Sequence, residues 1–143
     1  MQAKTIVAPV TLSVVIPCFN EERTVQSCIE RVLKIQSEEL KLEIICVDDC
    51  STDSSYQVLK SLGRRYPEIK IVKHEENRGK GAALKSGLAQ ASGEIVAIQD
   101  ADLEYDPQDL KRLIQPILSG EADVILGSRF ATAGAHRVLY FWH

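Results

Sequence analysis

Residues 11–22 read TLSVVIPCFNEE, an apolar run that ends in a polar and acidic cluster, and this arrangement recurs along the chain. Residues 43–47 form a second apolar run, which is followed by Asp48 and Asp49. Residues 94–99 form another, which is followed by Asp100, Ala101 and Asp102. Because the carboxyl ends of parallel strands form the ligand crevice of an open α/β sheet, we expect these polar residues to meet there.

The segments between these clusters predict helices, so the fold class is α/β, an open, mainly parallel sheet with helices on both faces. Strands are predicted over residues 11–17, 43–47, 69–73, 94–99 and 122–126. Asn20 is predicted to cap the first helix, and Ser51 or Thr52 the second. A third helix is expected over residues 79–91, with Leu84, Leu88 and Ala91 turned inward. A fourth opens at Asp106-Pro107, and Pro116 should kink or shorten it.

Length and composition predict one globular domain over residues 1–143, with a flexible lead at 1–10. Hydrophobic residues make up 45% of the chain, charged residues 26%, and the net charge of -3 argues against a nucleic-acid partner. We expect no secretory signal from residues 1–9, and no apolar run in this sequence reaches the roughly 18 residues of a membrane span. The four cysteines, Cys18, Cys28, Cys46 and Cys50, fit no zinc spacing and are expected to be reduced thiols of a cytoplasmic protein.

The acidic run after residue 98 predicts a metal site. In extended chain, residues two apart point to the same side, so Asp100, Asp102 and Glu104 are expected to face one ligand. Carboxylates gathered in this way should raise each other's pKa unless a cation joins them. Their hard oxygens suit Mg²⁺ or Mn²⁺, which also bind substrate phosphates. The alternative is a solvated acidic loop with Asp106 as a helix cap.

Three more segments carry candidate ligand contacts. Asp49 can accept hydrogen bonds from a base or ribose while Ser51 or Thr52 caps the following helix, and both interpretations can hold. The run NRGKG at residues 77–81 offers backbone N–H groups and the cations Arg78 and Lys80 to an anion, or is an ordinary solvated loop. It is neither a dinucleotide fingerprint nor a P-loop. Arg129 follows the last predicted strand and suits a phosphate, or forms a surface salt bridge.

Together these segments resemble the inverting nucleotide-sugar glycosyltransferases of family two, which have the GT-A fold. The matching runs are VVIPCFNEE at 14–22, VDDCSTD at 47–53, NRGKG at 77–81, DADLE at 100–104 and GSRF at 127–130. DADLE and GSRF look most like the branch that makes polyprenyl-phosphate sugars, such as dolichol-phosphate mannose and glucose. Cys50 departs from the family, which usually has Gly or Asn at this position, and Glu104 stands where several relatives have Gln.

The resemblance implies a role for each matching residue. Asp49 and Val47 would contact base and ribose, Asp100 and Ala101 would lie against ribose and diphosphate, and Lys80 would also bind the nucleotide. Asp102 and Glu104, with Asp100, would hold the metal, and Asp102 and Arg129 would be catalytic. The remaining nucleotide-pocket residues would be Pro17, Phe19, Asn20 and Glu21.

The activity implied is metal-dependent, inverting transfer of a hexose from a UDP- or GDP-sugar to a polyprenyl phosphate, in the cytoplasm or at the cytoplasmic face of a membrane. Residues 131–143 would begin an acceptor region that the chain does not contain, so a nucleotide-sugar-binding module without transfer activity is the alternative. A phospho-receiver domain is disfavoured, because its acidic pair would follow the first strand, whereas Asp48 and Asp49 follow the second. A nucleotidyltransferase is also disfavoured, because it would need a Gly-rich basic loop after the first strand, and residues 17–20 are not one. Base, sugar and oligomeric state stay open.

Overall fold

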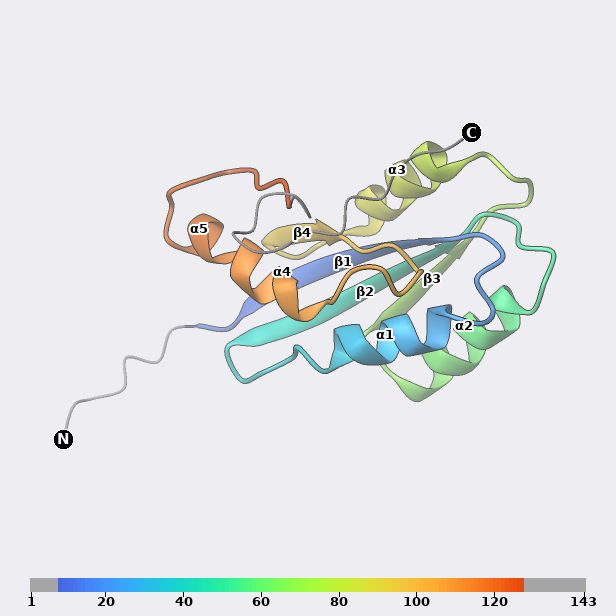
Figure 1. Cartoon of the computed structure of the whole chain (residues 1–143), viewed down its shortest axis with the longest axis horizontal. Helices are drawn as coiled ribbons and strands as arrows, with labels where there is room; N and C mark the ends of the chain where they lie inside the picture. Colours follow the sequence, from blue (N-terminus) through green and yellow to red (C-terminus); the bar gives the residue numbers. More distant parts are fainter. Residues whose placement is uncertain (1–7, 128–143) are drawn as a thin grey trace, which may run out of the picture. The chain divides into compact units, whose positions relative to one another are not determined.

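The computed structural model describes residues 8–127, and its centre is a four-stranded parallel sheet (Figure 1). The strands are β1 (Val10–Cys18), β2 (Leu40–Asp48), β3 (Ile69–Lys73) and β4 (Ile95–Ile98), in the order β3-β2-β1-β4. The predicted α/β class and parallel pairing are confirmed. Since β1 lies between β2 and β4, the chain ends of β1, β2 and β4 are neighbours, and this places three of the polar clusters along one edge.

Helices cover both faces of the sheet. Figure 1 shows α1 (Val25–Leu33) and α2 (Ser55–Arg65) on one side and α3 (Lys80–Gln90) on the other. The predicted apolar face of α1 is confirmed, with Val25, Cys28, Ile29 and Val32 buried. In α2 the buried apolar residues are Leu59 and Leu62. Such one-sided burial is what holds a short amphipathic helix on a sheet.

The face of the sheet that meets α3 contains Val15, Ile45 and Val47, which pack against Ala83. The predicted inward face of α3 is wrong at Leu88, which is 46% exposed. Ala83 and Gly87 face inward instead. The small side chains allow the helix backbone to approach the valines closely, and this contact overrides the preference for burying leucine.

The starts of the first two helices, predicted from capping residues, are wrong, whereas Asp106 accepts from Gln108 N–H at the start of α4 as expected. α1 begins after Thr24 and α2 after Ser54, and neither cap residue makes a side-chain cap hydrogen bond. Asn20 and Ser51 lie outside the helices, because hydrogen bonds join the loop that contains Asn20 to the loop that contains Ser51. Local capping chemistry was therefore outcompeted by a tertiary contact.

The predicted strand over residues 122–126 is also wrong, since these residues form no strand in the structure. Alternating apolar residues produce a strand only where a neighbour supplies the ladder hydrogen bonds, and here Ala122 N–H donates to the Pro116 carbonyl instead. β4 is shorter than predicted and not fully buried, with Val96 42% exposed and Ile98 49% exposed. As Pro116 indicated, the fourth helix is interrupted, giving α4 (Gln108–Leu113) and α5 (Gln115–Leu118).

The chain divides into two compact units after Arg112, and the sheet with α1, α2 and α3 belongs to the first. The expectation of one domain over residues 1–143 stays a prediction. Within residues 8–127, no helix is both long enough and apolar enough to cross a bilayer.

Candidate ligand-binding site

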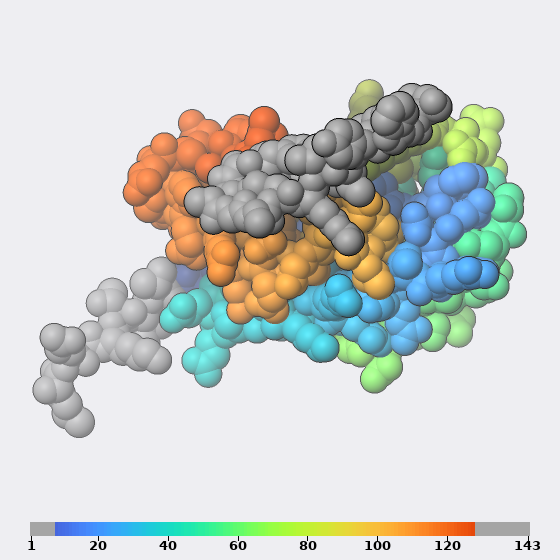
Figure 2. Space-filling model, viewed as in Figure 1, coloured from blue at the N-terminus to red at the C-terminus, as the bar shows by residue number. Residues whose placement is uncertain are grey.

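A cavity of about 330 Å³ opens at the carboxyl ends of β1, β2 and β4. Asp49 and Asp102 both line it, so the prediction that these two carboxylates meet at one edge is confirmed. Figure 2 shows the surface here, where the blue segment after β1 and the orange segment after β4 meet. A hydrogen bond from Cys28 Sγ to the Asp100 carbonyl, 3.3 Å, joins α1 to the segment after β4. The other predicted residues that line the cavity are Pro17, Phe19, Glu21, Lys80, Asp100 and Ala101.

One wall of the cavity is set by the loop after β1, which is fastened to the loop after β2. Asn20 N–H donates to Ser51 Oγ at 3.0 Å, and Asn20 Oδ1 accepts from Thr52 N–H at 2.8 Å. Asn20 has a φ of 53°, a left-handed conformation that asparagine tolerates. These bonds engage the backbone N–H and the side-chain oxygen of Asn20, which therefore braces the loop and does not line the cavity.

The acidic residues of these loops continue the same contact. Glu21 N–H donates to Ser55 Oγ at 2.7 Å, and Glu22 N–H donates to an Asp53 carboxylate oxygen at 3.2 Å. In return, Glu22 Oε2 accepts from Ser54 N–H at 2.9 Å. Several motif residues that were candidate helix caps therefore hold the two loops together, and this fixes Phe19 and Glu21 at the cavity wall.

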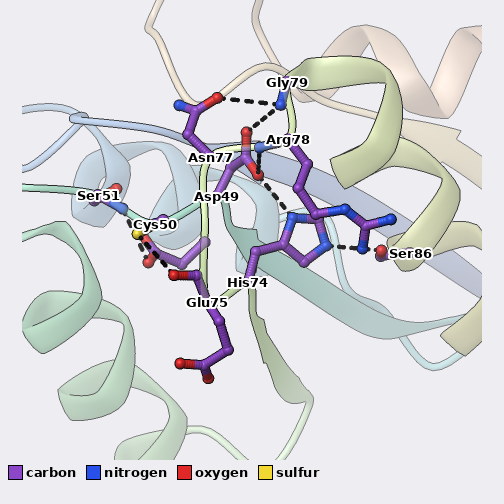
Figure 3. A network of polar contacts seen from close by, with 10 residues as sticks. Asp49, Cys50, Ser51, His74, Glu75, Asn77, Arg78, Gly79 and Ser86 are labelled. Carbon is purple, nitrogen blue, oxygen red and sulfur yellow. Dashed lines mark hydrogen bonds and ion pairs between the residues drawn. The ribbon is translucent and has the colours of Figure 1, made fainter.

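Asp49 lies at the centre of a buried polar network (Figure 3). Its Oδ1 accepts from Arg78 N–H at 2.9 Å and lies 2.7 Å from His74 Nδ1, and its Oδ2 accepts from Gly79 N–H at 2.7 Å. His74 Nε2 lies 2.8 Å from Ser86 Oγ on α3. Asp49 is 3% exposed and His74 6% exposed. The network thus joins the ends of β2 and β3 to the start of α3.

This network decides the charge of Asp49. Burial by itself would raise the pKa of the carboxyl, but the hydrogen bonds from Arg78, His74 and Gly79 outweigh it and lower the pKa below its usual value. The expectation that gathered carboxylates raise each other's pKa is wrong at this residue, because its nearest polar neighbours are donors. Asp49 is therefore ionised at neutral pH and can only accept hydrogen bonds.

His74 is the site residue that the sequence interpretation missed. It directly follows β3, so the rule applied to the other strands, that polar residues after a parallel strand reach the ligand edge, would have found it. Further lining residues not assigned a role beforehand are Cys18, Asn77, Gly79 and Ala83. Burial raises the pKa of the Cys18 thiol to about 12, so it stays protonated at neutral pH and is a poor nucleophile.

The acidic run after β4 is arranged differently from the prediction. The chain bends over residues 101–105 and does not continue as a strand, and Asp102 Oδ1 accepts from Glu104 N–H at 3.2 Å. Alternate residues therefore do not share one side, and Glu104 does not line the cavity. Across residues 8–127, no three His, Cys, Asp or Glu side chains come together as a metal site. The predicted cluster of Asp100, Asp102 and Glu104 is corrected accordingly.

Two carboxylates nevertheless remain suited to a cation. Asp100 Oδ1 accepts from Lys80 Nζ at 2.6 Å, while its Oδ2 and the Oδ2 of Asp102 have no hydrogen-bond partner within the described chain. Mg²⁺ and Mn²⁺ commonly take one or two carboxylates and complete their shell with water and substrate phosphates. The donor set thus fits a cation shared with a phosphorylated ligand, and does not form a closed protein site.

The two remaining candidates are Val47 and Arg129. Val47 is fully buried in the core against Ala83 and does not line the cavity, and its contact with base or ribose stays a prediction. Arg129 lies outside the described residues. Its role stays a prediction, as do the ligand contacts assigned to the lining residues.

Comparison with known proteins identifies relatives of this chain. It is 32% identical to a dolichol-phosphate mannosyltransferase of Pyrococcus furiosus over 86% of this chain and 34% of that protein. It is 37% identical to a dodecaprenyl-phosphate galacturonate synthase of Rhizobium johnstonii over 82% of this chain and 36% of that protein. The chain therefore spans about a third of the length of these two relatives.

Solved structures show the same fold. Glucosyl-3-phosphoglycerate synthase of Mycobacterium tuberculosis, in complex with Mn²⁺, UDP and glucosyl-3-phosphoglycerate, has a TM-score of 0.64 and 32% identity, over 78% of this chain and 41% of that one. A mannosyltransferase of Pyrobaculum calidifontis with GDP-mannose and Mn²⁺ has a TM-score of 0.58 and 30% identity, over 68% and 28%. Residues 13–139 match the family described as "Glycosyl transferase family 2". The chain belongs to this family and has the GT-A fold.

Proposed function

We propose that this chain binds the nucleotide-sugar donor of a metal-dependent inverting glycosyltransferase, which moves a hexose from a UDP- or GDP-sugar to a polyprenyl phosphate. The observation that carries the proposal is the single cavity in which Asp49, Asp100, Asp102 and Lys80 meet. The relatives named for polyprenyl-phosphate products support the acceptor class. The neighbours crystallised with Mn²⁺ and UDP or GDP-mannose support the donor and the cation.

In this function the residues of the cavity would position the donor and neutralise the charge of its diphosphate. Asp49 would orient the nucleoside through its fixed carboxylate. Asp102, with Asp100, would hold Mg²⁺ or Mn²⁺, and Lys80 lies at the same wall. When bound, the cation neutralises the nucleoside diphosphate that leaves the sugar.

A polyprenyl phosphate is already anionic at neutral pH, so its oxygen can attack the anomeric carbon from the face opposite the leaving group without a general base. This accounts for inversion and asks the protein only to align donor and acceptor. Since the acceptor is a membrane lipid, the reaction would take place at a membrane surface, with Arg129 near the phosphates of donor or acceptor.

The test is titration calorimetry of UDP and GDP with and without Mn²⁺. We expect Mn²⁺ to strengthen binding of at least one nucleotide to the wild-type chain, and Asp102→Ala to weaken that Mn²⁺-dependent binding at least about tenfold through loss of a charged ligand. Glu38→Ala is the matched control, because Glu38 is an exposed acid outside the cavity. Unchanged Mn²⁺-dependent binding in Asp102→Ala would remove the metal assignment.

A nucleotide-sugar-binding module without transfer activity is the second candidate, favoured by the share of its relatives' length that the chain spans. A single-turnover assay with donor sugar and polyprenyl phosphate separates the two. Product formation by these 143 residues rules out the binding-only function.

A further inference from the structure

The proton positions in the Asp49 network follow from its geometry. Asp49 is an ionised acceptor, so the hydrogen between Asp49 Oδ1 and His74 Nδ1, 2.7 Å apart, belongs to the histidine. In the neutral ring, Nε2 is then the acceptor, and the Ser86 hydroxyl donates a hydrogen bond to it across 2.8 Å. His74 is 6% exposed and is bonded at both ring nitrogens, so its donor is held towards Asp49.

Counting acceptor positions shows what is left for a ligand. Each carboxylate oxygen offers about two lone-pair sites. His74 and Arg78 N–H occupy both sites of Oδ1, whereas Gly79 N–H occupies one site of Oδ2. Among residues 8–127 no other donor reaches this carboxylate, so Asp49 itself offers a ligand in the cavity one open acceptor position, on Oδ2.

The two candidate bases differ in what they present to such a group. The pairing edge of uracil has one donor, N3–H, between two carbonyl oxygens. The pairing edge of guanine has two adjacent donors, N1–H and an N2 hydrogen, which a carboxylate satisfies by using both oxygens. With Oδ1 filled, one guanine donor would find no acceptor on Asp49, and a donor that loses its partner on binding discriminates strongly against that base.

We propose that His74 is a specificity-determining residue, which closes Oδ1 of Asp49 and thereby makes the donor site select a uridine over a guanosine nucleotide. This inference rests on the proposed function, since it names the donor of that same site. It assigns a uridine diphosphate sugar as the substrate class. His74 touches no substrate in this scheme and acts through Asp49.

The variants separate the donor from the ring. His74→Ala removes the Nδ1 donor and opens Oδ1 to a second ligand hydrogen bond. His74→Asn is the matched control, because the asparagine amide can place an N–H where Nδ1 lies, although it cannot reach Ser86. Ser86→Ala is a milder third variant, in which the ring keeps its Nδ1 donor but loses its anchor on α3, so that the donor is held less firmly towards Asp49 and the preference for UDP should narrow.

The experiment measures dissociation constants of UDP and GDP by calorimetry in the presence of Mn²⁺, with circular dichroism melting to confirm folding. We expect wild type to bind UDP at least about tenfold more tightly than GDP, the ratio that one unsatisfied hydrogen bond produces. In His74→Ala the ratio of the GDP to the UDP dissociation constant should fall about fivefold or more. In His74→Asn the same ratio should stay within about twofold of wild type. If His74 had only a structural role, its replacement would weaken binding of both nucleotides equally and leave the ratio of their dissociation constants unchanged.

Equal binding of the two nucleotides by wild type, or preference for GDP, overturns the inference and leaves the proposed function standing. An unchanged ratio in folded His74→Ala also overturns it. If His74→Ala does not fold, two measurements test the inference instead: the wild-type ratio, and the ratio in Ser86→Ala. A ratio in Ser86→Ala equal to that of wild type then overturns it. Failure of wild type to bind either nucleotide overturns the proposed function, and the inference with it.

Discussion

At the scale of single residues, Cys50 carries a backbone conformation that its side chain does not favour. Its φ is 62°, in the left-handed region, which costs a residue with a Cβ about 1–2 kcal/mol. Asparagine tolerates this region better than most residues. The family usually has Gly or Asn at this position, and the positive φ supplies the physical reason for that preference.

We therefore predict that Cys50→Asn raises the free energy of unfolding by roughly 0.5–1 kcal/mol, because the strain falls while the only side-chain bond lost is the weak one from Cys50 Sγ to the Glu75 carbonyl. Urea unfolding measures the change. Cys50→Ala is the control, since alanine keeps the strain and should give no gain. A stability of Cys50→Asn equal to or below that of Cys50→Ala would contradict the strain assignment.

At the scale of elements, two glycines of α3 should respond to alanine with opposite signs. A Cβ at Gly87 would lie 2.4 Å from Val15 Cγ1 and 3.2 Å from Val47 Cγ2, so Gly87→Ala should push the helix off the sheet. We expect a net loss of about 1–2 kcal/mol, because overpacking outweighs the gain in helix propensity. Gly81→Ala meets nothing within 4 Å and should gain up to about 1 kcal/mol. Thermal unfolding of both variants checks this, and a stable Gly87→Ala would place α3 further from β1 than described.

The elements also show what the sequence could and could not predict. Short apolar segments located all four strands. The runs of the central strands β1 and β2 are nearly continuous because both faces of the sheet are covered there, whereas β3 contains two lysines and β4 is partly exposed. Helix starts failed at Asn20 and Ser51, since a residue's capping preference says nothing about a partner loop some 30 positions away, such as the Asn20–Ser51 bond. The strand predicted at 122–126 failed for want of a pairing neighbour. In the site, Asp49 and Asp102 were found from their place after a strand, whereas Glu104 was misplaced because the bend at 101–105 carries no strong local signal.

At the scale of the whole sheet, one buried acid links strands that are far apart in sequence. Glu43 on β2 is 7% exposed and accepts hydrogen bonds from Ser13 Oγ on β1 at 2.5 Å, from Ser92 N–H and Oγ at 2.8 Å each, and from Lys70 Nζ on β3. Ser13 Oγ in turn accepts from Gly93 N–H at 2.8 Å, which holds the turn before β4. Both oxygens of Glu43 are thereby satisfied, so the group stabilises the sheet only while it is ionised.

Burial by itself would raise the pKa of Glu43, but the bonds from Lys70, Ser13 and Ser92 outweigh it and lower the pKa from 4.5 to about 2. Because the folded-state pKa lies below the unfolded one, the unfolded chain takes up the proton first as pH falls. The stability that ionised Glu43 contributes is thus fully present above pH 4.5 and is lost between pH 4.5 and about pH 2.

Glu43→Gln should lower the free energy of unfolding by about 1–3 kcal/mol at pH 7, and this difference from wild type should shrink as the pH falls through that acid range. Urea unfolding from pH 7 to pH 2.5 measures it, with Glu38→Gln on the exposed loop before β2 as the control that should follow the wild-type curve. A cost of Glu43→Gln that stays constant with pH would mean that the acid holds the strands by its shape and not by its charge.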